Sequence, residues 1–208
     1  MALAAEHPQH EPLILLSALS VLWLSPQDSQ AVTLLQRYHA RGFPREALRE
    51  TALQLFLLAG FQASLEATFQ IRDVLGDGLP AEEPELVRLD APFWLERGKE
   101  LQTSVYRENT SKLRENLTAA SPELSVWTVL VGYGLVLSRP GLPSHWRELI
   151  EVALLVVQGF PRQLHSHLRG AVNLGATHAE VELMLSLASI FAPERQSASA
   201  WHMWRRIK

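Results

Sequence analysis

A chain of 208 residues with a formal net charge of −3 has no overall basic field that would hold nucleic acid or an anionic membrane. Hydrophobic residues make up 47% of it, which is enough to fill the core of one sizeable domain or of two small ones. Cysteine is absent, which excludes disulfides, thiolate nucleophiles, iron–sulfur clusters and cysteine-ligated zinc.

The first patterned segment is the apolar run Leu13–Leu24. It has the length of a signal-peptide core, but Glu6 and Glu11 precede it instead of Lys or Arg, and no convincing cleavage site follows. The run is also too short to cross a bilayer, which takes about 20 apolar residues. We therefore expect a buried first helix, a cytoplasmic location and no membrane contact.

The next segments have helical periodicity, and no segment alternates as a strand would. The run Ser25-Pro26-Gln27-Asp28 has the composition of a helix start, and it predicts a helix that ends near Gly42. A second helix begins at Phe43–Glu46. Gly60-Phe61 marks a bend, and a third helix is predicted from Ser64 to about Leu75.

Residues 76–92 form the one clear linker, because Gly, Pro and acidic residues dominate them. Helical pattern resumes at Phe93 and is predicted to continue to about Leu117. Ser121-Pro122 begins another helix, which ends before the turn Arg139-Pro140-Gly141.

The stretch from Ser144 to Glu180 has the clearest signals for where helices begin and end. Ser144 is predicted to cap a helix that runs through Glu148 to about Gln158, and Gly159-Phe160-Pro161 breaks it. The helix that follows ends at Gly175, since glycine suits the left-handed position after a helix. Thr177-x-x-Glu180 is a capping box that opens the next helix. The chain is thus predicted to be all-α.

A faint internal repeat appears when the sequence is shifted by 133 positions, which places Gly42 on Gly175. Few residues are identical, but the helix ends and restarts coincide. We expect two related helical halves, residues 1–75 and residues 93–208, joined by the linker 76–92.

Three motifs carry a family resemblance: Arg147-Glu148-Leu149, then Gln163–Ala171, then Gly175-Ala176-Thr177 with Glu180. Together they resemble the carboxymuconolactone decarboxylase family, which also contains the alkyl hydroperoxidase D-like proteins. The match is best over residues 93–192, and residues 42–75 look like the end of a second copy. The resemblance implies an alkyl hydroperoxidase D-like helical bundle and a homo-oligomer whose helices interlock between subunits.

The redox branch of that family carries a glutamate, two cysteines and a histidine, and these positions fall on Glu148, Phe160, Gln163 and His167. Glutamate and histidine are retained, whereas both sulfurs are missing. Peroxide reduction and disulfide exchange need a thiolate, so we exclude thiol peroxidase activity.

The decarboxylase branch implies proton transfer on a small carboxylate or lactone without a cofactor. His167 is then the expected proton shuttle and Glu148 its partner or a second acid–base group. For substrate binding we expect Gln163, Phe160, Tyr133 and one of two arginines, Arg162 or Arg169.

Other interpretations remain open. Glu148 and His167 also fit a buried structural pair, which would make the protein a non-catalytic structural or small-molecule-binding member of the family. His165 and His167 point to nearly opposite faces of one helix, and no third ligand is evident, so we expect no metal site. The pair Trp201 and Trp204 is expected to pack against the core or a neighbouring subunit, not to bind nucleic acid.

Overall fold

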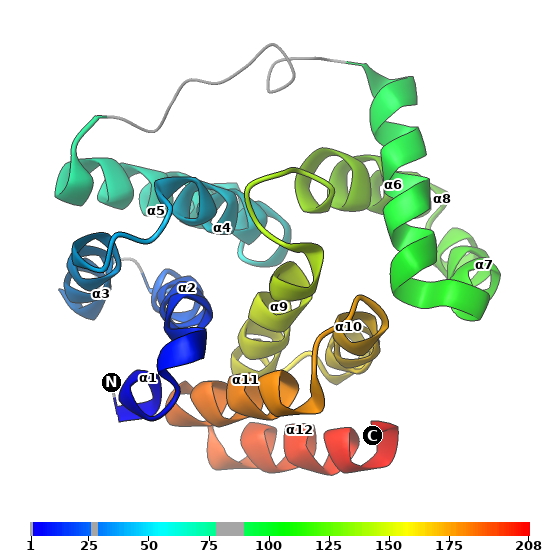
Figure 1. Cartoon of the computed structure of the whole chain (residues 1–208). Coiled ribbons are helices and arrows are strands. Elements are labelled where there is room, and N and C mark those ends of the chain that lie inside the picture. The colour runs from blue at the N-terminus through cyan, green and yellow to red at the C-terminus, as the bar shows by residue number, and fades with distance from the viewer. Residues whose placement is uncertain (1, 26–28, 78–89) are drawn as a thin grey trace. The chain divides into compact units, whose positions relative to one another are not determined.

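The computed structural model describes residues 2–25, 29–77 and 90–208, and no strand occurs among them, so the all-α prediction is confirmed. The elements are shown in Figure 1. The α-helices are α1 Ala2–Glu6, α2 Glu11–Leu22, α3 Ser29–Ala40, α4 Arg45–Leu58, α5 Gly60–Leu75, α6 Ala91–Tyr106, α7 Thr110–Ala120, α8 Pro122–Trp127, α9 Ser144–Gln158, α10 Pro161–Asn173, α11 His178–Phe191 and α12 Glu194–Ile207. Short 3₁₀ turns η1 (Pro8–His10) and η2 (Arg107–Asn109) and a π-helix η3 (Thr128–Leu137) complete the list. No described helix is long and apolar enough to cross a membrane.

Several helix boundaries differ from those predicted. The helix expected over residues 93–117 is broken, because Arg107 has a positive φ of 50° and separates α6 from α7. Ser144 is the first residue of α9 and not its cap. Helix α5 begins at Gly60, ahead of the expected Ser64. The predicted cap residues 26–28 and most of the expected linker, residues 78–89, lie outside the described residues.

Most helices begin and end at the capping and helix-breaking residues that the sequence predicts. Gly175 has a φ of 101°, and Gly159 takes the left-handed conformation after α9, as their positions require. The Thr177–Glu180 capping box is present with both of its hydrogen bonds. Trp204 is fully buried and its Nε1 donates to Glu182, which confirms the packing role.

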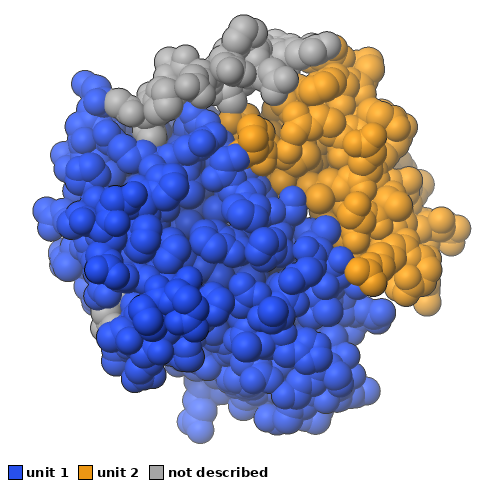
Figure 2. Space-filling model, in the orientation of Figure 1, with its two compact units in different colours: residues 1–79, 141–208 blue, residues 80–140 orange. Residues whose placement is uncertain are grey.

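The chain forms two compact units, coloured separately in Figure 2. Unit 1 consists of Met1–Leu79 and Gly141–Lys208, and unit 2 is Pro80–Pro140. These units divide the chain differently from the halves expected at residues 1–75 and 93–208, because the second half contributes helices to both units.

Helix α9 is the centre of unit 1. Its residues Arg147–Val156 are all buried, and it contacts α2, α4, α10, α11 and α12. A helix that is surrounded on every side presents no solvent face, so the charged residues within this run need partners from the neighbouring helices.

The internal repeat lies in unit 1, where two sets of four helices follow one another along the chain in the same order. Arg45 and His178, which begin α4 and α11, lie 133 positions apart, and both helices have 14 residues. The same shift relates α2 to α9, α3 to α10 and α5 to α12, with ends that agree closely. Contacts are repeated too, because α2 packs on α3 and α11 as α9 packs on α10 and α4. The structure thus contains two related sets of four helices, α2–α5 and α9–α12.

In unit 2, two glycines allow α6 and η3 to lie in close contact. A Cβ built on Gly98 would overlap the backbone carbonyl of Val129, and one on Gly134 would overlap that of Trp94. Backbone atoms cannot move aside as a flexible side chain does, so both positions exclude any larger residue.

We predict that Gly98→Ala and Gly134→Ala each destabilise the protein by about 1–3 kcal/mol, the typical cost of overpacking, measured by thermal or urea unfolding. Gly132→Ala is the matched control, because a Cβ at Gly132 meets nothing within 4 Å. Equal stability of all three variants would show that the close approach of α6 and η3 is unimportant.

Candidate functional site

Helices α9 and α10 are brought together by the short break between them. Gly159 ends α9 in the left-handed conformation, with a φ of 74°, and Pro161 occupies the first turn of α10, where its missing N–H is harmless. Glu148 and Glu151 are three residues apart on α9, so they share one face of that helix. His167 comes from the buried face of α10.

These three side chains meet in the interior and are called here the acid–histidine cluster. Nδ1 of His167 lies 2.9 Å from Oε2 of Glu148 and 2.6 Å from Oε2 of Glu151. Both glutamates are almost fully buried, and 9% of His167 is exposed. The contact expected between Glu148 and His167 is therefore present, and a second carboxylate shares the same ring nitrogen.

Burial and charge act together on the protonation of the cluster. Burial raises the pKa of Glu148; the imidazole of His167 opposes this shift, and the nearby Glu151 reinforces it. For His167, burial by itself lowers the pKa, but the two carboxylates outweigh it and hold the pKa well above its ordinary value. The ring is therefore an imidazolium near neutral pH, with one nitrogen fixed by acids.

A second layer of polar residues supports the start of α9. Nη2 of Arg147 lies 3.0 Å from Oε2 of Glu50 on α4, and both side chains are buried. Nε of Arg49 also donates to Glu50, at 3.4 Å. Gln54, one turn further along α4, donates its Nε2 to the backbone carbonyl of Arg147 at 2.9 Å. Helix α4 thus fixes the turn of α9 that carries Glu148 and Glu151.

The candidate substrate-binding side chains of α10, Arg162, Gln163 and Arg169, are all exposed, but they lie on different faces of the helix. Gln163 lies four positions before His167 and shares its face of the helix. Arg162 and Arg169 are rotated by roughly 140° and 200° from His167 in an ideal helix, so they point to other faces. The sequence left open which arginine faces the site, and the structure turns both away from His167.

Two further residues are not members of the acid–histidine cluster. Tyr133 belongs to unit 2, where it is buried in η3 and donates its hydroxyl to Tyr106 at 3.0 Å. Its proposed role in substrate binding therefore stays a prediction. His165 is exposed while His167 is buried, which confirms that the two histidines occupy opposite faces of α10.

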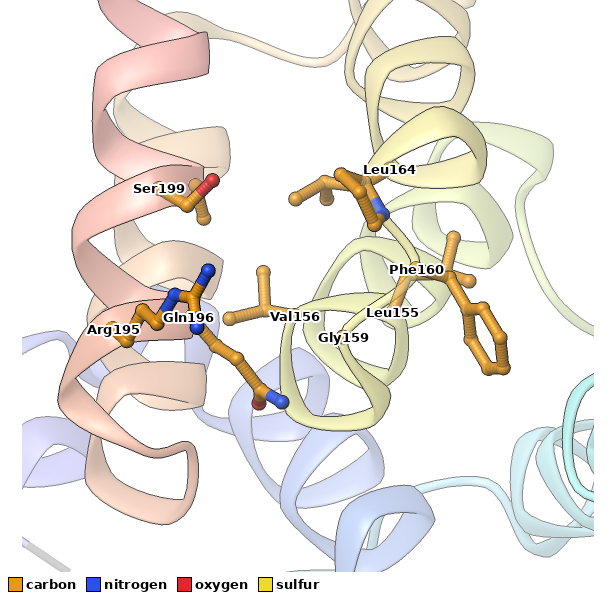
Figure 3. A pocket seen from close by; sticks show the side chains of 10 residues that line it. Leu155, Val156, Gly159, Phe160, Leu164, Arg195, Gln196 and Ser199 are labelled. Carbon is orange, nitrogen blue, oxygen red and sulfur yellow. The ribbon is translucent and has the colours of Figure 1, made fainter.

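Phe160 lines a cavity of about 320 Å³ where the end of α9 and the start of α10 face α12. Figure 3 shows this cavity, with Arg195 and Ser199 on the α12 side and the ring of Phe160 turned away from that helix. The full lining is Leu155, Val156, Gly159, Phe160, Pro161, Leu164, Arg195, Gln196, Ser199 and Ala200. Neither His167 nor a glutamate of the cluster is part of it, so it is not the space in which His167 would meet a substrate.

The ligand atoms of Glu148, Glu151 and His167 all lie within 4.8 Å of one another, which is close enough to hold a metal ion. Three potential ligands are therefore present, because two carboxylates on one turn of α9 supply what a second histidine cannot, and the expectation of no metal site stays a prediction. Metal binding would need an unprotonated Nδ1, whereas the two acids favour a proton on that ring. The two carboxylates and the imidazole can therefore either share a proton or bind a metal ion.

Three residues of this site were not identified from the sequence. Glu151 had a usable signal, since an acid three residues after Glu148 in an otherwise apolar helix shares its buried face. Arg147 was noticed only as part of a motif. Glu50 had no usable signal, because the residue that it pairs with is 97 positions away.

Comparison with known proteins agrees with this geometry. The sequence profile of the carboxymuconolactone decarboxylase family matches residues 122–204, which include the whole acid–histidine cluster. A 4-carboxymuconolactone decarboxylase of Acinetobacter baylyi is 33% identical over 112 residues, which are 53% of this chain and 84% of that relative. The chain belongs to the carboxymuconolactone decarboxylase family.

In two other relatives, the match covers a smaller share of the relative's own length. A nitrosuccinic acid decarboxylase of Metarhizium robertsii is 31% identical over 94 residues, or 45% of this chain and 63% of the relative. Peroxisomal protein 2 of Saccharomyces cerevisiae is 27% identical over 125 residues, or 57% of this chain and 44% of the relative. The proteins that this chain resembles therefore include both decarboxylases and peroxisomal proteins.

The raised pKa of His167 predicts how stability varies with pH. A group whose pKa is higher in the folded state contributes stability that is complete below its unfolded pKa and is lost as the pH rises through its folded pKa. We expect the free energy of unfolding to fall above pH 6.5, the ordinary pKa of histidine, by at most about 1.4 kcal/mol per pH unit for one proton.

Urea unfolding between pH 6 and 10 measures this dependence. The triple variant Glu148→Gln/Glu151→Gln/His167→Gln is the reference, because it removes the imidazole together with both acids and so leaves no buried titratable group of the cluster in place. Its curve is expected to lack the decline above pH 6.5. Parallel curves for the variant and the natural chain would contradict the assigned direction of the shift.

Proposed function

We propose that this protein is a cofactor-independent, decarboxylase-type enzyme that transfers a proton on a small carboxylate or lactone and has no thiol peroxidase activity. The observation that carries the proposal is the fixing of Nδ1 of His167 by two buried carboxylates, which leaves Nε2 as the nitrogen that can reach a substrate. The decarboxylases among the relatives support the reaction class.

In the proposed reaction, the bond between the substrate's carbon and its carboxylate breaks and CO2 leaves. The electron pair stays on the carbon skeleton, delocalised into a conjugated carbonyl. Nε2–H of His167 then gives its proton to the carbon, and solvent later restores that proton. A raised pKa favours this role, because the acid is in its protonated form at neutral pH.

Glu151 and Glu148 would act on the ring from the other side. Glu148 accepts a hydrogen bond from Nδ1–H and Glu151 lies beside the same nitrogen, so together they orient the imidazolium and stabilise its charge, as carboxylates commonly do for catalytic histidines. Glu148, with its raised pKa, is the group better suited to exchange a proton with the ring during turnover. Both are assigned here as partners of His167, not as groups that touch the substrate.

Among the candidate substrate-binding residues, Gln163 is the one that shares the face of His167, and its amide suits a carbonyl or carboxylate. Phe160, Arg162, Arg169 and Tyr133 stay predictions with less support, since the arginines point to other faces of α10 and Tyr133 lies in unit 2. A homo-oligomer and a cytoplasmic location also stay predictions. Two relatives are named as peroxisomal proteins, so a peroxisomal location is the alternative to test.

The second candidate is a non-catalytic member of the family that binds small molecules or serves as a structural module. The observation in its favour is that the charge of His167 is already paired with two acids inside the cluster and that the three side chains have little exposure. A structural tie between α9 and α10 would have the same appearance.

The test is release of CO2 from 4-carboxymuconolactone and from nitrosuccinic acid, the acids in the relatives' names. We expect His167→Gln to lower kcat by about 10²–10⁴-fold, the usual contribution of a general acid. His165→Gln is the matched control, because it makes the same change on the exposed face of α10 and should retain activity. Dialysis against a chelator should leave the turnover of the natural chain unchanged.

The pH profile separates a chemical role from a structural one. Removing one carboxylate with Glu151→Gln should lower the pKa of His167 and move the alkaline limb of kcat to lower pH. Absence of turnover on both acids with a correctly folded natural chain would favour the non-catalytic alternative, and so would full activity of His167→Gln.

A further inference from the structure

The first repeat of unit 1 contains a cavity of about 380 Å³ that is not part of the acid–histidine site. It lies among α1, α2, α3 and α11, and its lining is Ala2, Leu3, Ile14, Ala18, Leu22, Gln30, Thr33, Leu34, Leu187, Ile190 and Phe191. Among these described residues, none carries a charge. Its floor is buried and apolar, whereas Gln30 and Thr33 are exposed.

This cavity occupies the position in the first repeat that the acid–histidine site occupies in the second. A shift of 133 positions relates four side chains of its lining to four of that site: Ile14 to Arg147, Ala18 to Glu151, Leu34 to His167 and Leu187 to Gln54. The supporting helices correspond as well, since α2, α3 and α11 here take the places of α9, α10 and α4 there.

The change of residues explains why a cavity exists here. Ala18 stands where the second repeat has Glu151, so the side chain that reaches the imidazole there is replaced by a single methyl group. Leu34 in place of His167 removes the other half of the ion pair. The duplicated frame is retained, but polar atoms that filled its centre are gone, and the space that remains has an apolar surface.

We propose that this cavity is a second ligand site, which binds an uncharged molecule with an aliphatic chain. An apolar hollow of this size does not hold ordered water well, and it binds apolar molecules that fill it. The volume is within the usual range of small-molecule sites. The hydroxyl of Thr33 at the exposed side suits a neutral polar head group, and the absence of a charged lining residue disfavours an ionised one.

The first experiment is a titration of the full chain with n-hexanol, n-heptanol and n-octanol, followed by isothermal calorimetry. Each added methylene should tighten binding about fourfold while the cavity accommodates the chain. Octanoate is the charged counterpart of octanol, and it should bind at least about tenfold more weakly because burial of an unpaired carboxylate is costly. Equal affinity for octanol and octanoate would overturn the proposal.

The second experiment locates the site. Ala18→Leu fills the floor of the cavity and should lower the affinity for octanol about tenfold or more, as judged from the lost space for several methylenes. Ala200→Leu is the matched control, because Ala200 is a buried alanine in the lining of the other cavity. Octanol binding that is weakened by Ala200→Leu and not by Ala18→Leu would assign the ligand to the wrong cavity and overturn the proposal.

A third variant keeps the test informative if Ala18→Leu fails to fold. Ile190 is 66% exposed at the edge of the cavity, so Ile190→Glu should be tolerated and should weaken octanol binding by placing a charge beside the chain. Unchanged octanol affinity in this variant would count against the site. Because none of these residues belongs to the acid–histidine cluster, failure here leaves the proposed decarboxylase function untouched, and loss of CO2 release leaves this proposal untouched.

Discussion

The structure of unit 1 depends on the burial of two carboxylates on one turn of α9. Glu148 and Glu151 are almost fully withdrawn from water, and such a pair is costly unless an opposite charge lies between them. His167 provides that charge from α10. Helices α9 and α10 are therefore held in one register, because a shift along either helix would separate the imidazole from its acids and leave buried charge unopposed.

The first repeat then contributes to the site of the second. Glu50 and Gln54 of α4 reach the start of α9, where they bind the side chain and the backbone of Arg147. The corresponding positions on α11, the helix that packs on α2, carry Leu183 and Leu187, which are both buried. Both repeats thus keep the same helix contacts but differ in the residues at them. The contact of α4 with α9 is polar and contains an ion pair, whereas the contact of α11 with α2 borders an apolar cavity.

Much of this fold could be predicted from local sequence signals. Helical periodicity, the glycines at positions 159 and 175 and the Thr177 capping box act within a few residues, so their physics is visible in the sequence. The contact between Glu148 and His167 was also expected, because a family pattern marked both positions. Glu151 could have been added by counting helix turns.

Other features depend on contacts that no local pattern reveals. Arg107 adopts a positive φ without being glycine, so nothing in its neighbourhood announced the break between α6 and α7. The π-helical turn of η3 accompanies the close approach of α6 at Gly98 and Gly134, which is a tertiary contact. Glu50 became visible only when the chain brought it to Arg147, 97 positions away.

The missing sulfurs limit what the cluster can do. The redox branch places its cysteines at the positions of Phe160 and Gln163, and in this chain those positions hold an exposed ring and an exposed amide at the start of α10. Neither side chain undergoes the reversible oxidation of a thiol, so no thiol–disulfide step can begin at these two positions. Proton transfer makes no such demand. A histidine whose pKa is raised by two buried acids holds a proton at neutral pH, and the same charge that stabilises the fold of α9 against α10 is the charge that the proposed reaction would use.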